Sequence, residues 1–108
     1  MIDVFQHHLD IVTSILRQFV PDCEVRVFGS RFTHTAKKHS DLDIAIVENA
    51  KISSTLISEI AEAFQESDLP FRVDVLDWNA LNEEFKKVIT SAGYEVIQER
   101  NYASSIHY

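Results

Sequence analysis

Several features that would dominate the interpretation of a sequence are scarce or missing in this one. It contains one cysteine in 108 residues, which excludes an intramolecular disulfide and a cysteine-rich zinc site. No apolar run approaches the roughly 20 residues that a membrane-spanning helix needs. The N-terminus also lacks the basic-then-apolar pattern of a signal peptide. We therefore expect a cytoplasmic protein without a membrane segment.

Positive charge is scarce as well. Ten Lys and Arg residues stand against 17 Asp and Glu residues, and the formal net charge is −7. Proteins that hold nucleic acid by neutralising phosphates need clustered Lys and Arg, so direct nucleic-acid binding is not expected. The length suits one compact domain with one core. We expect this domain over residues 1–100 and a loose C-terminal tail over residues 101–108.

The spacing of apolar residues predicts an α/β domain (α+β class) in which helices and strands alternate. Helices are predicted over residues 3–19, 53–66 and 81–91, with Ser53 or Ser54 as an N-cap and the last helix ending near Gly93. Strands are predicted over residues 24–28, 41–47 and 71–76, with a short edge strand at 94–97. The polar stretch 31–40 is predicted to be a loop, or a short helix and a loop.

Small and acidic residues stand at related places on the three main strands. Gly29 and Ser30 directly follow the first strand, and Asp41 and Asp43 share one face of the second. Asp74 lies within the third strand, on the face opposite its apolar residues. Glycine permits a sharp turn and a close backbone approach to a ligand, and a serine hydroxyl can bind a phosphate oxygen. Taken singly, each feature is more typical of an ordinary turn or a solvated strand end.

Stability does not explain a group of three carboxylates. Two carboxylates about 4 Å apart repel by roughly 4 kcal/mol at an effective dielectric constant near 20. Magnesium prefers one or two carboxylates together with triphosphate oxygens and water. The sequence therefore predicts a magnesium and nucleotide site in which Asp41 and Asp43 hold the metal. Asp74 would share a second metal ion and take the proton from the attacking hydroxyl.

The spacing of these residues resembles a known family. Gly29-Ser30, ten residues, Asp41-x-Asp43 and a later strand aspartate are similar to the nucleotidyltransferases of the DNA polymerase β superfamily. The string FGSRFTHTAKKHSDLDIAI resembles the minimal nucleotidyltransferase (MNT) branch, and the resemblance extends over about residues 5–97. It implies a polymerase β-like fold with a small mixed β-sheet packed against helices, ATP as the substrate and Mg²⁺ as the metal. It also implies that Arg31 contacts the nucleotide, and His34 departs from a second glycine that is common in the family.

The resemblance further implies a role in HEPN-MNT toxin-antitoxin systems. MNT proteins of these systems act as antitoxins, either by binding a helical HEPN ribonuclease toxin or by transferring AMP to one of its tyrosines. The implied function is a magnesium-dependent protein adenylyltransferase with a HEPN-type toxin as partner, in a hetero-oligomer with it or as a homo-oligomer. Two alternatives stay open: a non-catalytic antitoxin, and an aminoglycoside-type nucleotidyltransferase for a small molecule.

The remaining noticeable residues are assigned more ordinary roles. The five histidines show no spacing typical of a zinc site. Lys37 and Lys38 could attract a triphosphate, but solubilising charge is the preferred interpretation. Trp78 and Phe85 are expected in the core rather than stacked on a ligand.

Overall fold

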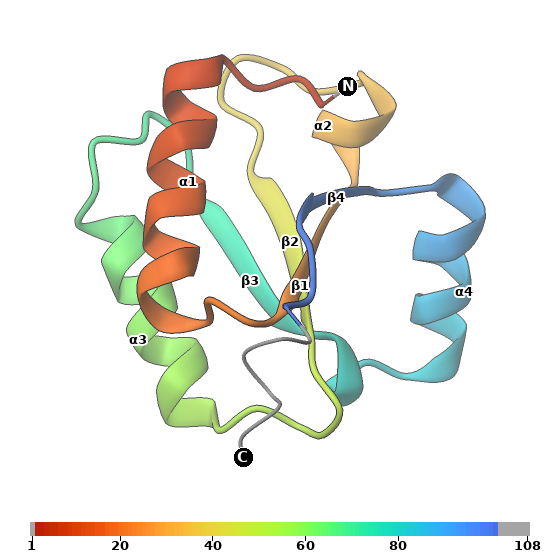
Figure 1. The fold of residues 1–108 in the computed structure, drawn as a ribbon. Helices are drawn as coiled ribbons and strands as arrows, with labels where there is room; N and C mark the ends of the chain where they lie inside the picture. Colours follow the sequence, from red (N-terminus) through yellow and green to blue (C-terminus); the bar gives the residue numbers. More distant parts are fainter. Residues whose placement is uncertain (1, 102–108) are drawn as a thin grey trace.

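The protein forms one mixed sheet with helices on both sides, as a computed structural model that describes residues 2–101 shows (Figure 1). The strands are β1 (Glu24–Phe28), β2 (Leu42–Val47), β3 (Val73–Asp77) and β4 (Glu95–Gln98), in the order β3-β2-β1-β4. β2 runs antiparallel to β1 and parallel to β3, and β4 pairs antiparallel with β1. The predicted α/β class, mixed sheet and edge strand are confirmed. The predicted C-terminal tail lies outside the described residues, except for Asn101.

The helices are divided unequally between the two faces of the sheet. They are α1 (Gln6–Phe19), α2 (Ser30–Thr33), α3 (Ser54–Gln65) and α4 (Glu83–Ala92), and a 3-10 turn, η1 (Trp78–Ala80), precedes α4. In Figure 1, α1 and α3 lie on one side of the sheet and α4 lies on the other. None of the helices within residues 2–101 has the length and apolar content that crossing a membrane requires.

Strand alternation explains why the two faces differ. Leu42, Ile44 and Ile46 are fully buried and belong to the main core, which α1 and α3 cover. The opposite face carries a smaller apolar cluster around Phe28 and Ala45, to which α4 contributes Ile89. The predicted sidedness of residues 42–46 is therefore confirmed, and Asp43 is directed to the α4 side.

Capping residues define where the helices begin and end. The Ser53 side chain accepts a hydrogen bond from the Leu56 N–H at 3.1 Å, which confirms one of the two predicted N-caps. Gly93 ends α4 with φ +98°, as predicted. The prediction missed Asn82, whose side chain accepts from the Phe85 N–H at 2.8 Å, so α4 starts at Glu83 rather than at residue 81.

Two predicted elements begin later than expected because their first residues make other contacts. The helix predicted from residue 3 starts at Gln6, since the Asp3 N–H donates to the Arg31 carbonyl at 2.7 Å. The strand predicted from residue 71 starts at Val73, and the Phe71 ring instead lies 4.3 Å from the Arg31 guanidinium carbon. Arg31 therefore ties both segments to α2.

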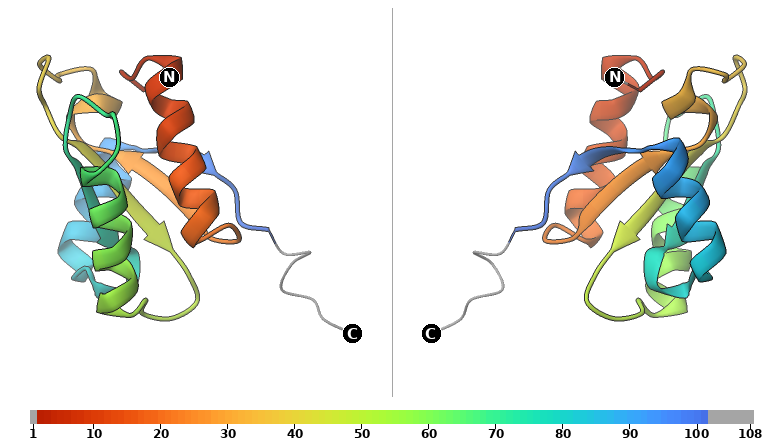
Figure 2. Two further views of the ribbon diagram at one scale, coloured as in Figure 1. Left: turned by 90° about the vertical axis from the view of Figure 1, so that its left-hand side faces the viewer. Right: turned by 90° about the vertical axis from the view of Figure 1, so that its right-hand side faces the viewer.

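One end of the molecule gathers segments that are far apart in the sequence. The segment before α1, α2 and the connection between α3 and β3 lie at this end of the sheet (Figure 2), where Arg31 contacts both Asp3 and Phe71. β1 ends there, while β2 and β3 begin there, because β1 is antiparallel to its neighbour and β2 and β3 are parallel. Polar residues at these strand ends can consequently share one site.

Candidate active site

A row across three strands brings two of the predicted carboxylates together. Phe28 pairs with Asp43 between β1 and β2, and Asp43 pairs with Asp74 between β2 and β3. Residues paired in register direct their side chains to the same face, and neighbouring strands lie about 4.8 Å apart. Asp43 and Asp74 thus stand side by side on the face that α4 partly covers. Asp41 is exposed and lies one residue before β2.

Gly29 closes this row at the end of β1. Its backbone has φ +75° and ψ −155°, a combination that is essentially restricted to glycine. A Cβ at this position would lie 3.3 Å from Asp43 Cγ and closer still to the Oδ2 oxygen of that residue. Glycine is therefore required here both for the turn and for the space that the Asp43 carboxylate occupies.

A pocket of about 430 Å³ opens over the carboxylate pair. Gly29, Asp43 and Asp74 supply its polar wall. The other lining residues are mostly apolar and come largely from α4: Phe28, Leu76, Phe85, Val88, Ile89, Ala92 and Gly93. An apolar pocket with a few convergent polar groups is the usual form of a small-molecule site. Its volume lies in the usual range of such sites.

The prediction for Phe85 was wrong. Its side chain is 38% exposed and lies in this pocket, with its ring edge-on to Phe28 at a centroid distance of 6.1 Å. Val88, one turn further along α4, is 61% exposed. The apolar spacing of α4 identified a helix but could not show that part of its stripe faces a pocket. Trp78 does pack in the smaller core cluster, where the Arg26 guanidinium lies 4.7 Å from its ring.

Asp43 and Asp74 are like charges that lie close together, and their repulsion shows in the pKa of Asp43. Burial is the largest cause that raises the pKa of Asp43 from 3.8 to about 6, followed by the charges of Asp74 and Asp41. Across residues 2–101, no hydrogen bond or ion pair reaches the carboxylates of these three aspartates. Asp77 offers the contrast, because its buried carboxylate accepts from the N–H groups of Ile52 and Asn79 at 2.9 and 3.1 Å.

The carboxylates suit a hard divalent cation, although they do not form a complete cage. In the part of the chain that the structure describes, no three His, Cys, Asp or Glu side chains are already grouped to hold a metal ion. Magnesium needs only one or two protein carboxylates, since phosphate oxygens and water complete its shell. Asp43 and Asp74, with Asp41 nearby, supply that number. Their mutual repulsion gives a cation an electrostatic reason to bind.

The other nucleotide-binding candidates have different positions. Ser30 is the first residue of α2, immediately beside Gly29. The Arg31 side chain is only 7% exposed, and its guanidinium donates to the carbonyl oxygens of Asp3, Lys38 and Ser40. The structure therefore does not bring this guanidinium into the carboxylate pocket. Its observed contacts anchor the segment that leads into Asp41 and β2.

The departure at residue 34 has a visible structural counterpart. His34 ends α2 in the left-handed conformation, with φ +61° and ψ +31°. It is the one non-glycine residue with positive φ within the described residues. A glycine fits this conformation without steric cost, whereas a side chain is disfavoured there.

Comparison with known proteins agrees with this geometry. The polymerase β nucleotidyltransferase family model matches residues 6–102. A Haemophilus influenzae protein named probable protein adenylyltransferase MntA is 46% identical over 99 residues, which cover 92% of this chain and 86% of that protein. The chain belongs to the polymerase β nucleotidyltransferase family.

Solved structures share the fold of this nucleotidyltransferase. One, described as a toxin-antitoxin with AMP-PNP, has a TM-score of 0.71 at 19% identity, over 90% of this chain and 77% of that chain. Another, described as a tri-AMPylated Shewanella oneidensis HEPN toxin in complex with MNT antitoxin, has a TM-score of 0.66 at 18% identity. That match covers 93% of this chain and 76% of the other. At these identities the likeness establishes the fold.

Proposed function

We propose that this nucleotidyltransferase is a magnesium-dependent protein adenylyltransferase that moves AMP from ATP to a hydroxyl of a HEPN-type toxin and thereby acts as its antitoxin. The observation that carries the proposal is the pair Asp43 and Asp74, which lie side by side next to Gly29 and have no hydrogen-bond partner among residues 2–101. The choice of a protein acceptor is supported by the name of the Haemophilus relative and by the tri-AMPylated toxin in the fold neighbour.

The proposed roles follow from where the side chains stand. In the transfer, the acceptor oxygen bonds to the α-phosphorus of ATP, and the bond from that phosphorus to the pyrophosphate oxygen breaks. Gly29 lets the backbone approach the phosphates closely, with the Ser30 hydroxyl beside it. Asp41 and Asp43 would hold Mg²⁺, which supplies positive charge at the triphosphate oxygens when bound. Asp74 would accept the proton of the attacking hydroxyl.

The decisive experiment incubates the purified protein with labelled ATP, Mg²⁺ and the cognate HEPN-type protein. We expect label on the partner, and no label when EDTA removes Mg²⁺. Asp43→Asn and Asp74→Asn keep the shape of each side chain but remove its charge and basicity, so each should lower the transfer rate by about 100-fold or more. Asp68→Asn, at an exposed carboxylate in the α3–β3 connection, is the matched control and should label normally.

The outcomes separate this function from its alternatives. If Asp43→Asn transfers AMP at the wild-type rate, the catalytic assignment is wrong. A wild-type protein that protects cells from the toxin without labelling it would indicate a non-catalytic antitoxin. Label on an added aminoglycoside and none on the protein would indicate a small-molecule nucleotidyltransferase.

A further inference from the structure

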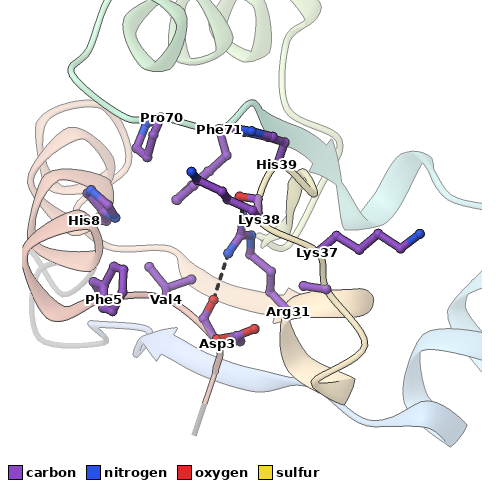
Figure 3. A pocket seen from close by; sticks show the side chains of 11 residues that line it. Asp3, Val4, Phe5, His8, Arg31, Lys37, Lys38, His39, Pro70 and Phe71 are labelled. Atoms are coloured by element: carbon purple, nitrogen blue, oxygen red, sulfur yellow. Dashed lines mark hydrogen bonds between the residues drawn. The ribbon is translucent and has the colours of Figure 1, made fainter.

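A second pocket, of about 450 Å³, lies at the same end of the molecule and has no role in the proposed chemistry (Figure 3). Its walls come from the N-terminal segment, the first turn of α1, α2, the segment 36–39 and the connection before β3. It is lined by Asp3, Val4, Phe5, His8, Arg31, Ala36, Lys37, Lys38, His39, Pro70 and Phe71. The segment that contributes Lys38 and His39 continues directly into Asp41, so a short stretch of chain connects this pocket to the start of β2.

The charge of this second pocket is opposite to that of the whole chain. Three of the ten Lys and Arg residues line it, against one carboxylate, that of Asp3, although the net charge of the protein is −7. The Arg31 guanidinium donates its hydrogen bonds to uncharged carbonyl groups, and no carboxylate among residues 2–101 pairs with its positive charge. In Figure 3 the Lys38 side chain extends toward Phe71, whereas Lys37 points away from the pocket. The pocket thus favours an anionic ligand near Lys38.

The same pocket has an apolar and aromatic wall. Phe5 is 74% exposed, which is unusual for a phenylalanine, and Phe71 lies across the space from it (Figure 3). The His8 ring packs edge-on against Phe71 at a centroid distance of 5.8 Å. Burial, followed by the charges of His7 and Arg31, lowers the pKa of His8, so at neutral pH this ring adds flat surface rather than charge. Exposed apolar side chains with a polar rim are typical of a protein interface.

We propose that this second pocket docks an acidic segment of the partner protein, with an apolar side chain between Phe5 and Phe71 and carboxylates at Lys38. A protein segment is favoured over nucleic acid, because the single amine of Lys38 in this pocket, on a protein with a net charge of −7, is a poor match for a chain of phosphates. The choice of a HEPN-type protein as the partner rests on the proposed function. Docking here would hold the partner at the end of the sheet where β2 and β3 begin, which is also the end that carries Asp43 and Asp74.

The test measures the affinity of the cognate HEPN-type protein for three variants by titration calorimetry. Lys38→Glu reverses the charge at the pocket, and Lys51→Glu makes the same change at an exposed lysine in the β2–α3 connection. Phe5→Ser removes the exposed ring while placing a good capping residue at the N-cap of α1, so folding should not suffer. We expect Lys38→Glu and Phe5→Ser to weaken binding by about tenfold or more and Lys51→Glu to leave it unchanged.

Binding of magnesium-ATP, measured on the same variants, separates this inference from the proposed function. It should be unchanged in all three. If the wild-type protein labels its partner but Lys38→Glu and Phe5→Ser bind that partner normally, the docking site is wrong and the proposed function stands. If Lys38→Glu weakens a complex in which no label is transferred, the docking site stands and the proposed chemistry fails. A fluorescent single-stranded oligonucleotide that binds the wild type and not Lys38→Glu would overturn the assignment to a protein segment.

Discussion

The carboxylate pair should make the fold less stable, and Asp43→Asn should reveal this cost. Folding raises the pKa of Asp43 from 3.8 to about 6, through burial first and then through Asp74 and Asp41. The folded protein therefore binds this proton more tightly than the unfolded chain does. By linkage, the contribution of Asp43 to the free energy of unfolding should fall as the pH rises from about 4 to about 6, and it should stay lowered above that range.

The size of the effect follows from the same values. The difference between 3.8 and about 6 corresponds to about 3 kcal/mol at 1.36 kcal/mol per pKa unit. The Asp43 side chain is only half-buried, so solvent screening should reduce this to about 1 to 2 kcal/mol. Asparagine has nearly the same shape and no charge. Asp43→Asn should consequently be more stable than wild type by that amount above pH 6, and by almost nothing near pH 4.

Urea unfolding followed by fluorescence provides the assay, because Trp78 is the one tryptophan in the chain and packs in the smaller core cluster. Unfolding curves are compared at both pH values for wild type, Asp43→Asn and the exposed control Asp68→Asn. Magnesium should stabilise wild type more than Asp43→Asn. An Asp43→Asn protein that is less stable than wild type above pH 6, or equally changed at both pH values, would refute the electrostatic reasoning.

Three further changes test other parts of the structure. Gly29→Ala should lower the free energy of unfolding by about 2 kcal/mol or more in urea melts and also weaken magnesium-ATP binding, because its Cβ would displace the Asp43 carboxylate. Arg31→Ala should lower the free energy of unfolding by about 3 kcal/mol, because it leaves three carbonyl groups without their charged donor. Its control, Arg17→Ala at an exposed position on α1, should lower it by less than about 0.5 kcal/mol. Asp77→Ala should lower the free energy of unfolding by about 1 to 3 kcal/mol, because it leaves the N–H groups of Ile52 and Asn79 unpaired. Its ATP-binding isotherm should be normal, which would confirm that Asp77, unlike Asp74, has a structural role.

Strand alternation carried most of the successful prediction. Because side chains on a strand alternate between two faces, the buried positions of Leu42, Ile44 and Ile46 were enough to direct Asp43 to the opposite face. The sequence could not show that β2 and β3 are parallel neighbours in register. That pairing places Asp74 directly beside Asp43, and it depends on the long connection through α3.

Long-range contacts explain what the sequence could not predict. The type and position of Arg31 suggested a phosphate ligand, but its partners come from residues 3, 38 and 40, which only the folded chain brings together. Phe85 has helical spacing like any core residue, but in the folded chain it lines the same pocket as Gly29 and Asp43 and stays 38% exposed. The second pocket likewise combines segments that are distant in the sequence.

The position of β3 at the edge of the sheet has a dynamic consequence. Asp43 lies on an inner strand held on both sides, whereas Asp74 lies on a strand with one hydrogen-bonded neighbour. Edge strands open more readily than inner ones, so fraying of β3 would move Asp74 away while Asp43 stays in place. A cation bound by both aspartates would stabilise the pairing of β3 with β2 and so slow amide exchange along β3. Cation binding at the site and the stability of the edge strand β3 would then be coupled.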